Sequence, residues 1–118
     1  MAPQASAGIE KLNIARASSR VVEPWSPVIV AQLNGQEVKL ARMRGEFVWH
    51  THEDADELFV VVEGSFRLEL RDRAIDVGNG ELVVVPRGVE HRPVADADCI
   101  VMVMEPMGTV NTGSSVAG

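Results

Sequence analysis

Three histidines and one glutamate have a spacing that suits a metal site. His50 and His52 stand two residues apart in a stretch that favours a β-strand, so both imidazoles project from the same face. Glu57 follows after one tight turn, on a strand that we expect to run antiparallel to the first and to bring its carboxylate beside the imidazoles. His91 lies beyond a Pro-x-Gly turn and completes the set if the fold returns it to this face. Three neutral nitrogen donors and one anionic oxygen predict a site for one divalent transition metal ion.

The strands that must position these residues are predicted to be short. From residue 28 onward, runs of β-branched and apolar residues are separated by turn residues about every eight to twelve positions, which is typical of an all-β sandwich or barrel. Asn34-Gly35 is a strong hairpin signal, because both residues tolerate positive φ. The expected strands are 28–33, 37–43, 47–52, 57–63, 66–71, 74–77, 82–85, 91–93 and 99–105.

The two ends of the chain are predicted to lie outside this β domain. Residues 1–27 form an N-terminal arm, in which 13–20 favour a short helix and the prolines of 23–27 favour an extended connection. Residues 28–107 form a single domain, which is large enough to bury a core without disulfides. Residues 108–118 are mostly small and polar and are expected to form a flexible C-terminal tail.

The composition excludes several classes of partner. Eleven Lys and Arg against 17 Asp and Glu give a net charge of −6, which repels a nucleic-acid backbone. The longest apolar run, 99–104, is far shorter than the roughly 18 residues of a membrane helix. Cys99 is the single cysteine, and its apolar neighbours predict a buried thiol in a reducing compartment. Because residues 1–8 also lack an export signal, we expect a cytoplasmic protein without nucleic-acid or membrane partners.

Two sequence motifs resemble those of the cupin family. The first, a glycine followed by His-x-His, a glutamate and another glycine, is matched by Gly45, His50, His52, Glu57 and Gly64. The second, which contains Gly, Pro-x-Gly and His, is matched by Gly80, Pro86, Gly88 and His91. The resemblance implies a cupin jelly roll, also called a double-stranded β-helix, and it implies that the three histidines and the glutamate are the metal ligands.

One alternative ligand and two departures accompany the resemblance. Asp56 also falls within the family spacing, but the longer side chain of Glu57 and the match of its strand to the motif favour Glu57. Four residues separate Gly45 from His50 where the family usually has five, and Ala95 stands where the second motif usually ends in Asn. Neither position is a ligand. A wider resemblance connects the chain to small single-domain cupins that are often labelled mannose-6-phosphate isomerase-like.

The metal site is expected to face a mostly apolar pocket. Because side chains alternate between the two faces of a strand, residues two or four positions from a ligand also point inward. These pocket residues are Val48, Phe59, Val61 and Pro93. An apolar lining around a charged ion fits a small organic ligand that binds through oxygen atoms. Four protein ligands leave open positions on a six-coordinate ion for water, dioxygen, or a bidentate enol or hydroxy acid.

The leading prediction is a metal-dependent enzyme that acts on a small oxygenated metabolite, either a dioxygenase or an isomerase, with iron, manganese, nickel or zinc. Glu57 is the candidate catalytic residue, and Glu46 is the other carboxylate expected near the ion. The chain has no tyrosine, and its two lysines, Lys11 and Lys39, lie outside the motifs, which disfavours a phenolic or lysine acid beside the metal. The alternative is a non-catalytic binding or sensing module that uses the same pocket.

The outer face of the predicted sheet suggests a homodimer. The residues that alternate with the inward set are apolar as well, and a strand that is apolar on both faces must be covered on both. These outward residues are Leu58, Val60, Val62, Leu82 and Val84. The segment around Trp25 or a second subunit can supply the cover, and small cupins commonly pair. We therefore expect a homodimer.

Overall fold

The computed structural model describes residues 8–115 of the chain. Within this part, no helix is long and apolar enough to cross a membrane. The one helix described is α1 (Ile14–Ser18). The strands are β1 (Val28–Leu33), β2 (Gln36–Glu46), β3 (His50–Thr51), β4 (Glu57–Glu63), β5 (Ser65–Glu69), β6 (Ala74–Gly78), β7 (Leu82–Val85), β8 (Arg92–Pro106) and β9 (Ser114–Ser115). The all-β prediction is confirmed.

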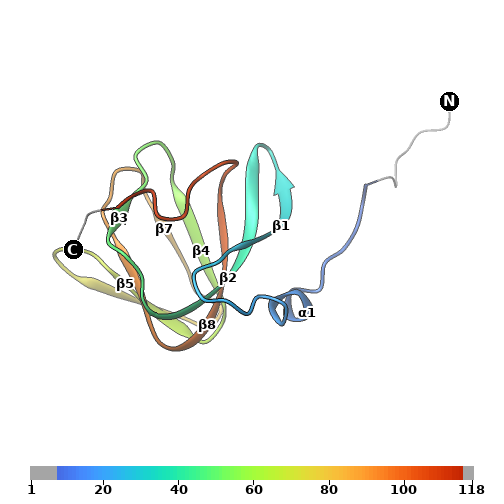
Figure 1. The fold of residues 1–118 in the computed structure, drawn as a ribbon, viewed down its shortest axis with the longest axis horizontal. Helices are drawn as coiled ribbons and strands as arrows, with labels where there is room; N and C mark the ends of the chain where they lie inside the picture. The colour runs from blue at the N-terminus through green and yellow to red at the C-terminus, as the bar shows by residue number, and fades with distance from the viewer. Residues whose placement is uncertain (1–7, 116–118) are drawn as a thin grey trace.

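An open antiparallel sheet forms the body of the molecule (Figure 1). Its strand order is β1-β2-β8-β4-β7, and the β5–β6 hairpin joins this path through β8. On one edge, the first residues of the long strand β8 pair with β5 and its later residues pair with β4. On its other edge, β8 pairs with β2 along both parts. β1 and β7 end the path, so the described strands do not close into a barrel. β3 and β9 form a separate two-stranded sheet.

The strand predicted over 47–52 is shorter in the structure and survives only as β3. The residues before it make single hydrogen bonds in place of a ladder. The Phe47 N–H donates to the Pro93 carbonyl oxygen at 3.0 Å, and the His50 ring donates to the Val48 carbonyl oxygen at 2.8 Å. This irregular course ends the alternation of inward and outward side chains before His50.

The strands predicted over 91–93 and 99–105 form one strand, β8. They are continuous because β2 pairs with both parts, across a register shift between Met43 and Gly45. Gly45 has a φ of +77°, a left-handed conformation that residues with a side chain rarely adopt, so glycine is the residue that suits this bulge. The strands predicted over 28–33, 57–63 and 82–85 have the predicted bounds.

The inner face of the sheet carries the main hydrophobic core. Alternate residues of the central strands point inward and are buried, as the two-residue period of a strand requires. This core includes Ala41, Met43, Phe59, Val61, Phe66, Leu68, Val101 and Val103. At one end of β2, β4 and β8 the buried inward residues become polar, namely Glu37, Lys39, Glu57 and Glu105. The inner face therefore has a long apolar part and a short charged end.

The outer face of the sheet is only partly covered. A second, smaller cluster joins the region of α1 to the sheet and consists of Ala17, Val21 and Leu40, with Val62 and Met102 at its edge. On the β7 side, Leu82 and Val84 are 62% and 51% exposed. The N-terminal arm therefore covers the part of this face near β2 and leaves the part near β7 open.

The C-terminal segment, residues 108–115, packs against the rest of the fold, whereas we expected a flexible tail. Strand β9 pairs with the two residues of β3, which supply an open strand edge. The Thr109 hydroxyl donates a hydrogen bond to the Pro106 carbonyl oxygen at 2.6 Å. Gly113 lies against Thr51 and His52, so closely that an added Cβ would meet both. The rest of the predicted tail, 116–118, and residues 1–7 of the predicted arm lie outside the described residues.

Candidate metal centre

The structure brings together the four predicted ligand residues. His50, His52, Glu57 and His91 each offer one ligand atom, and these atoms all lie within 4.8 Å of one another. All four residues are buried, with exposed fractions of 7% or less. His50 lies on β3, Glu57 begins β4 and His91 directly precedes β8. Reciprocal backbone hydrogen bonds of 3.0 Å between His50 and His91 bring the two motifs together.

The two other carboxylates considered at the sequence level lie outside this cluster. Asp56 accepts hydrogen bonds from the backbone N–H and the guanidinium of Arg87, at 2.9 and 3.3 Å, on the protein surface. Glu46 pairs with Arg92 at 3.3 Å, and its side chain is 63% exposed. Glu57 is therefore the only one of the three that faces the histidines.

The histidine rings are oriented by backbone carbonyl groups. The Nδ1–H of His50 donates to Val48 at 2.8 Å, and the Nδ1–H of His91 donates to Val89 at 2.9 Å. Because Nδ1 holds the proton in this tautomer, Nε2 keeps a free lone pair. Such second contacts are the usual means by which proteins orient metal-binding histidines.

Three buried atoms at the centre of the cluster have no hydrogen-bond partner among the described residues. They are Nε2 of His52, Nε2 of His91 and Oε1 of Glu57. The glutamate oxygen lies 3.5 Å from the first nitrogen and 3.4 Å from the second. Buried polar atoms without partners are costly, and a cation placed among these lone pairs would satisfy all three. The donor set therefore fits a divalent transition metal ion.

The electrostatics of the cluster favour neutral imidazoles. Burial lowers the pKa of His50 to about 4, and burial also lowers the pKa of His52 and of His91. Burial, followed by the neighbouring carboxylate of Glu105, raises the pKa of Glu57 to about 10. At neutral pH the nitrogens are therefore ready to bind an ion, which must displace one proton from the glutamate.

A second buried carboxylate lies beside the cluster, and the motifs did not reveal it. The pairing of Leu58 with Met104 places their neighbours, Glu57 and Glu105, side by side on the inner face of the sheet. Glu105 is 1% exposed, and its Oε1 accepts a hydrogen bond from Lys39 Nζ at 2.8 Å. Parity along β8 contained the signal, since Glu105 continues the inward series of the strand. Lys39 has no such signal, because it lies outside both motifs.

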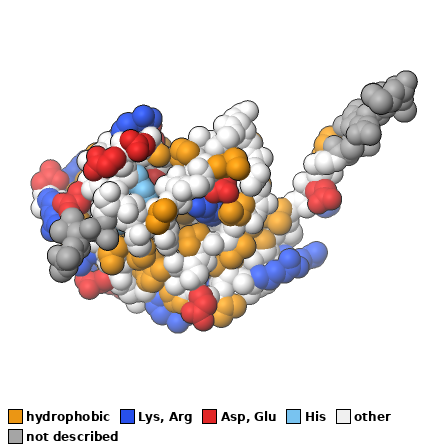
Figure 2. Space-filling view, turned by 45° about the horizontal axis from the view of Figure 1, so that its top comes forward, with side chains coloured by type: hydrophobic (Ala, Val, Ile, Leu, Met, Phe, Trp, Pro, Cys, Tyr) orange, Lys and Arg blue, Asp and Glu red, His pale blue; other side chains and the backbone are white. Residues whose placement is uncertain are grey.

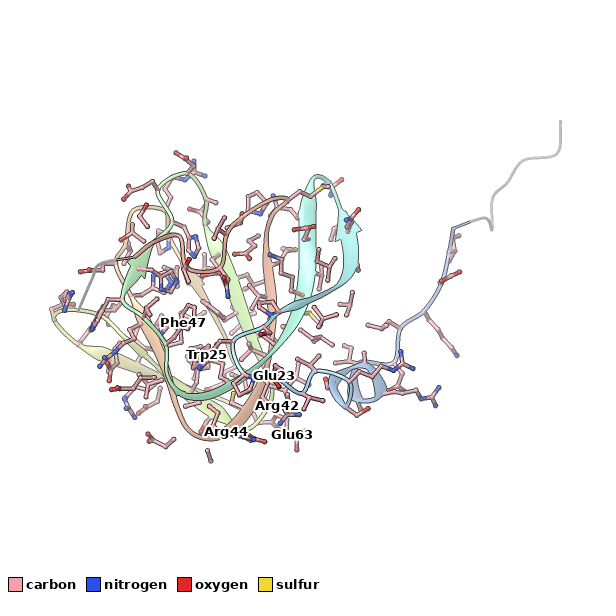
Figure 3. The ribbon with its side chains drawn as sticks, viewed as in Figure 1. Glu23, Trp25, Arg42, Arg44, Phe47 and Glu63 are labelled. Carbon is pink, nitrogen blue, oxygen red and sulfur yellow. The ribbon has the colours of Figure 1, made fainter. Side chains whose placement is uncertain are left out.

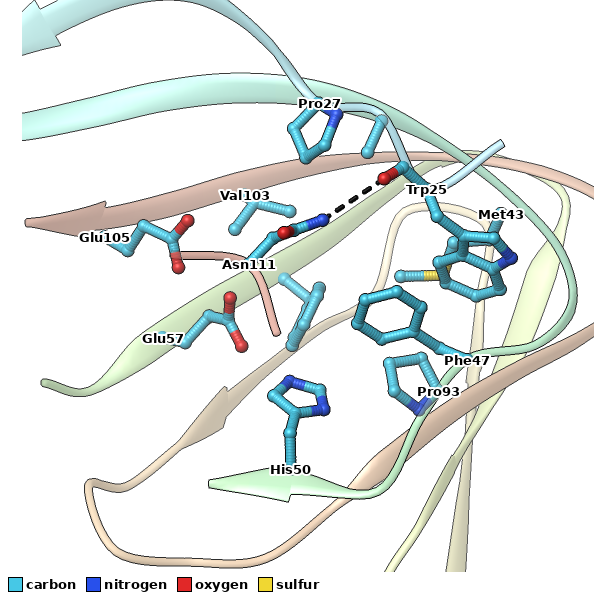
Figure 4. Close-up of a pocket in the computed structure, with 12 residues that line it drawn as sticks. Trp25, Pro27, Met43, Phe47, His50, Glu57, Pro93, Val103, Glu105 and Asn111 are labelled. Carbon is cyan, nitrogen blue, oxygen red and sulfur yellow. Dashed lines mark hydrogen bonds between the residues drawn. The ribbon is translucent and has the colours of Figure 1, made fainter. Parts of the chain in front are cut away.

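A small cavity opens beside the cluster (Figure 4). Its volume of about 40 Å³ is room for a few water molecules. Of the predicted pocket residues, Phe59 and Pro93 line it. Val48 lies on the irregular segment before β3 and is 41% exposed, and Val61 is buried in the core further along β4. The remaining lining residues are Trp25, Pro27, Ala41, Met43, Phe47, His50, Glu57, Val103, Glu105 and Asn111.

Trp25 closes one side of this cavity and is held by several contacts. Its ring stacks on Phe47 with a centroid distance of 4.7 Å (Figure 3). Its backbone N–H and indole N–H donate to the carbonyl oxygens of Arg42 and Arg44 at 2.9 and 3.0 Å. Its own carbonyl accepts from the Asn111 side chain at 3.1 Å. Trp25 has a φ of +61°, an unfavourable conformation for a residue with a large side chain, which these contacts maintain.

A larger hollow of about 510 Å³ lies outside the cluster, between the turn after β3 and the C-terminal segment. His52 lines it together with Glu53 and Asp54 of the acidic turn. Figure 2 shows histidine atoms visible from outside, close to acidic side chains. The cluster therefore lies between the inner apolar cavity and an outer hollow whose lining is partly acidic and partly apolar.

The sequence and the fold both have relatives among known proteins. The profile of the family Cupin_2, described as a cupin domain, matches residues 36–105, more than half of the chain. The chain belongs to the cupin family. The uncharacterized protein YdbB of Bacillus subtilis (strain 168) is 34% identical over 82 residues, which cover 68% of this chain and 72% of that protein.

Solved structures of other proteins share this fold. A cupin-2 domain containing protein from Shewanella frigidimarina NCIMB 400 superposes with a TM-score of 0.79 at 42% identity, covering 80% of this cupin and 93% of that chain. Protein NMB1881 from Neisseria meningitidis has a TM-score of 0.75 at 30% identity, covering 82% and 99%. The predicted jelly roll with a short N-terminal helix is confirmed.

Proposed function

We propose that this cupin binds one divalent transition metal ion through His50, His52, Glu57 and His91, and that it uses the ion to bind and transform a small oxygenated metabolite. One observation supports this proposal most directly: three buried ligand atoms converge and have no other partner among the described residues. A bound ion would supply Lewis acidity and open coordination positions. Iron, manganese, nickel and zinc all suit the ligands.

The surrounding residues support binding of a small molecule beside the ion. The carbonyl groups of Val48 and Val89 keep the rings of His50 and His91 in their tautomers. The aromatic wall made by Trp25 and its neighbours keeps water away from one side of the cavity and contacts the apolar part of a ligand. Glu57 is the carboxylate within the cluster of candidate ligands, and we assign it the catalytic role of accepting and passing on a proton.

Metal content tests the first part of this proposal. Untagged protein is expected to hold about one ion per chain by elemental analysis, and Glu57→Gln and His91→Ala are expected to lose it. Asp56→Asn provides a matched control, because it changes the neighbouring carboxylate, which faces Arg87 instead of the histidines. Full metal content in His91→Ala would show that the ligand assignment is wrong.

Turnover separates an enzyme from a binding module. Oxygen consumption by the metal-loaded protein is measured with diketones, hydroxy acids and catechols, and isomerised products are followed by NMR. Iron together with oxygen uptake that depends on the substrate supports a dioxygenase, whereas a product formed without oxygen supports an isomerase. Ligand binding without turnover supports the alternative, a non-catalytic binding or sensing module.

We also propose that two chains pair through the open part of the outer sheet face. Leu82 and Val84 on β7 are 62% and 51% exposed, and α1 does not reach them. Burial of such side chains contributes about 25 cal/mol per Å² of apolar surface. Light scattering at micromolar concentration is expected to give twice the mass of the chain. A monomer there would contradict the proposal.

A further inference from the structure

Glu105 lines the small cavity, and Lys39 binds only one of its two carboxylate oxygens. The residue is 1% exposed and lines the cavity together with Glu57 and His50. Its Oε1 is bound by Lys39, whereas its Oε2 accepts from no N–H group among the described residues, and the neighbouring Glu57 carboxyl hydrogen-bonds to Glu105 only while it holds its proton. In Figure 4 the carboxylates of Glu105 and Glu57 lie at the same end of the cavity.

The ion pair with Lys39 does not by itself account for this arrangement. The other contacts of the ammonium group go to the Thr109 carbonyl oxygen at 3.5 Å and to Glu37 at 3.8 Å. Lys39 therefore satisfies Oε1 of Glu105 and leaves Oε2 available. It also places a positive charge 2.8 Å from the Oε1 atom of Glu105. An ionised carboxylate accepts hydrogen bonds and donates none.

We propose that Glu105 is a second ligand-binding residue of this cupin, and that it accepts a hydrogen bond from a hydroxyl group of the small molecule that binds at the metal. The inference rests on the proposed metal function. It narrows the substrate class to small molecules that carry a hydroxyl group beside a metal-binding oxygen, as 2-hydroxy acids do. The volume of about 40 Å³ limits that polar end of the ligand to a few atoms. Lys39 is the positioning residue that holds the acceptor.

Two small acids distinguish this hydrogen bond from metal binding alone. Glycolate and methoxyacetate both offer a carboxylate and a neighbouring oxygen, but only glycolate has a hydroxyl hydrogen to donate. Their affinities are measured on Co²⁺-loaded protein through changes in its visible spectrum. A hydrogen bond to a charged acceptor predicts that the wild type prefers glycolate by about tenfold or more.

The variants assign that preference to Glu105. In Glu105→Gln the preference is expected to fall to roughly twofold, since the charged acceptor is lost. In Glu37→Gln it is expected to persist, because Glu37 contacts the same lysine but does not line the cavity. If Glu105→Gln does not fold, the variant Lys39→Met/Glu105→Gln removes both charges together and receives the same measurement.

The outcomes separate this inference from the metal proposal. Equal affinities in the wild type, or an unchanged preference in the Glu105 variants, would overturn the inference while Co²⁺ binding left the metal proposal standing. A preference lost equally in Glu37→Gln would also overturn it, because the effect would then follow from charge near Lys39 in general. Wild-type protein that binds no Co²⁺ would overturn both.

Discussion

Replacement of Glu57 by glutamine is expected to stabilise the metal-free fold, although it removes one of the four candidate metal ligands. Glutamine has nearly the same shape as a protonated glutamate, so packing changes little. The variant removes an electrostatic cost, which is that of burying a carboxyl group that would ionise in water. In the unfolded chain the carboxyl group ionises near its ordinary pKa of 4.5, whereas in the folded protein burial and then Glu105 raise this pKa to about 10. The folded state therefore holds a proton that the unfolded state releases.

The size of this effect follows from proton linkage. Between pH 4.5 and pH 10 the unfolded state binds fewer protons, so the contribution of Glu57 to stability falls as the pH rises. Over this range, each pH unit changes the free energy of unfolding by about 1.36 kcal/mol, because the two states differ by one bound proton. The free energy of unfolding of the metal-free wild type is therefore expected to lie about 3 kcal/mol below that of Glu57→Gln at pH 7. At pH 5 the difference should be less than about 1 kcal/mol. At pH 7 this difference corresponds to roughly 10–15 °C in Tm.

Urea unfolding in EDTA at pH 5, 6, 7 and 8 measures this difference directly. Asp56→Asn serves as the control, since Asp56 is exposed and lies outside the cluster. The stability difference between this variant and the wild type should not grow with pH in the same way. Addition of the native metal should then reverse the order, because an ion at 1,000 times its Kd stabilises only the protein that binds it, by about 4 kcal/mol. If Glu57→Gln in EDTA were no more stable than the wild type at pH 7, or if the difference did not grow with pH, the reasoning would be refuted.

Three further predictions concern the cluster and the core. Metal uptake at pH 7 is expected to release about one proton per ion, from Glu57, because burial keeps the histidines neutral. An indicator dye in weak buffer measures this proton release. Release of three protons per ion would contradict the prediction. Burial raises the pKa of Cys99 to about 11, so a thiol reagent at pH 8 should react only as fast as the chain unfolds, and rapid labelling of the native protein would contradict this. Gly64→Ala should destabilise the fold by about 2 kcal/mol or more, since φ is +93° and a Cβ would lie 2.7 Å from the Asp98 carbonyl oxygen. Gly80→Ala, with a similar φ and open space, should cost only about 1 kcal/mol in the same urea titration.

Local patterns predicted the sheet and the proximity of the four candidate ligand residues. The spacing of His50 and His52, the turn before Glu57 and the Pro-x-Gly turn before His91 are properties of short segments, and each segment folds largely as its own residues dictate. Strand boundaries were accurate where turn residues interrupt apolar runs. They failed at Phe47, where a contact with Pro93 replaces the expected ladder.

Residues whose role depends on distant contacts could not be predicted in the same way. Lys39 meets Glu105 across 66 positions of sequence, and Asn111 meets Trp25 across 86. Neither pair has a local pattern that indicates its partner. The packing of the C-terminal segment was missed for the same reason, because small polar residues resemble a flexible tail until the edge of β3 provides partners for them.

The two sides of the cavity come from parts of the chain that can change independently. All four candidate metal ligands lie within residues 36–105, the range that the family profile matches, whereas Trp25, Pro27 and Asn111 lie on either side of it. Substitutions at these three positions would reshape the space offered to a ligand and leave the ion's donors in place. Under the proposed function, changes at the flanks of the domain would alter which ligands fit, while the four candidate metal ligands stay unchanged.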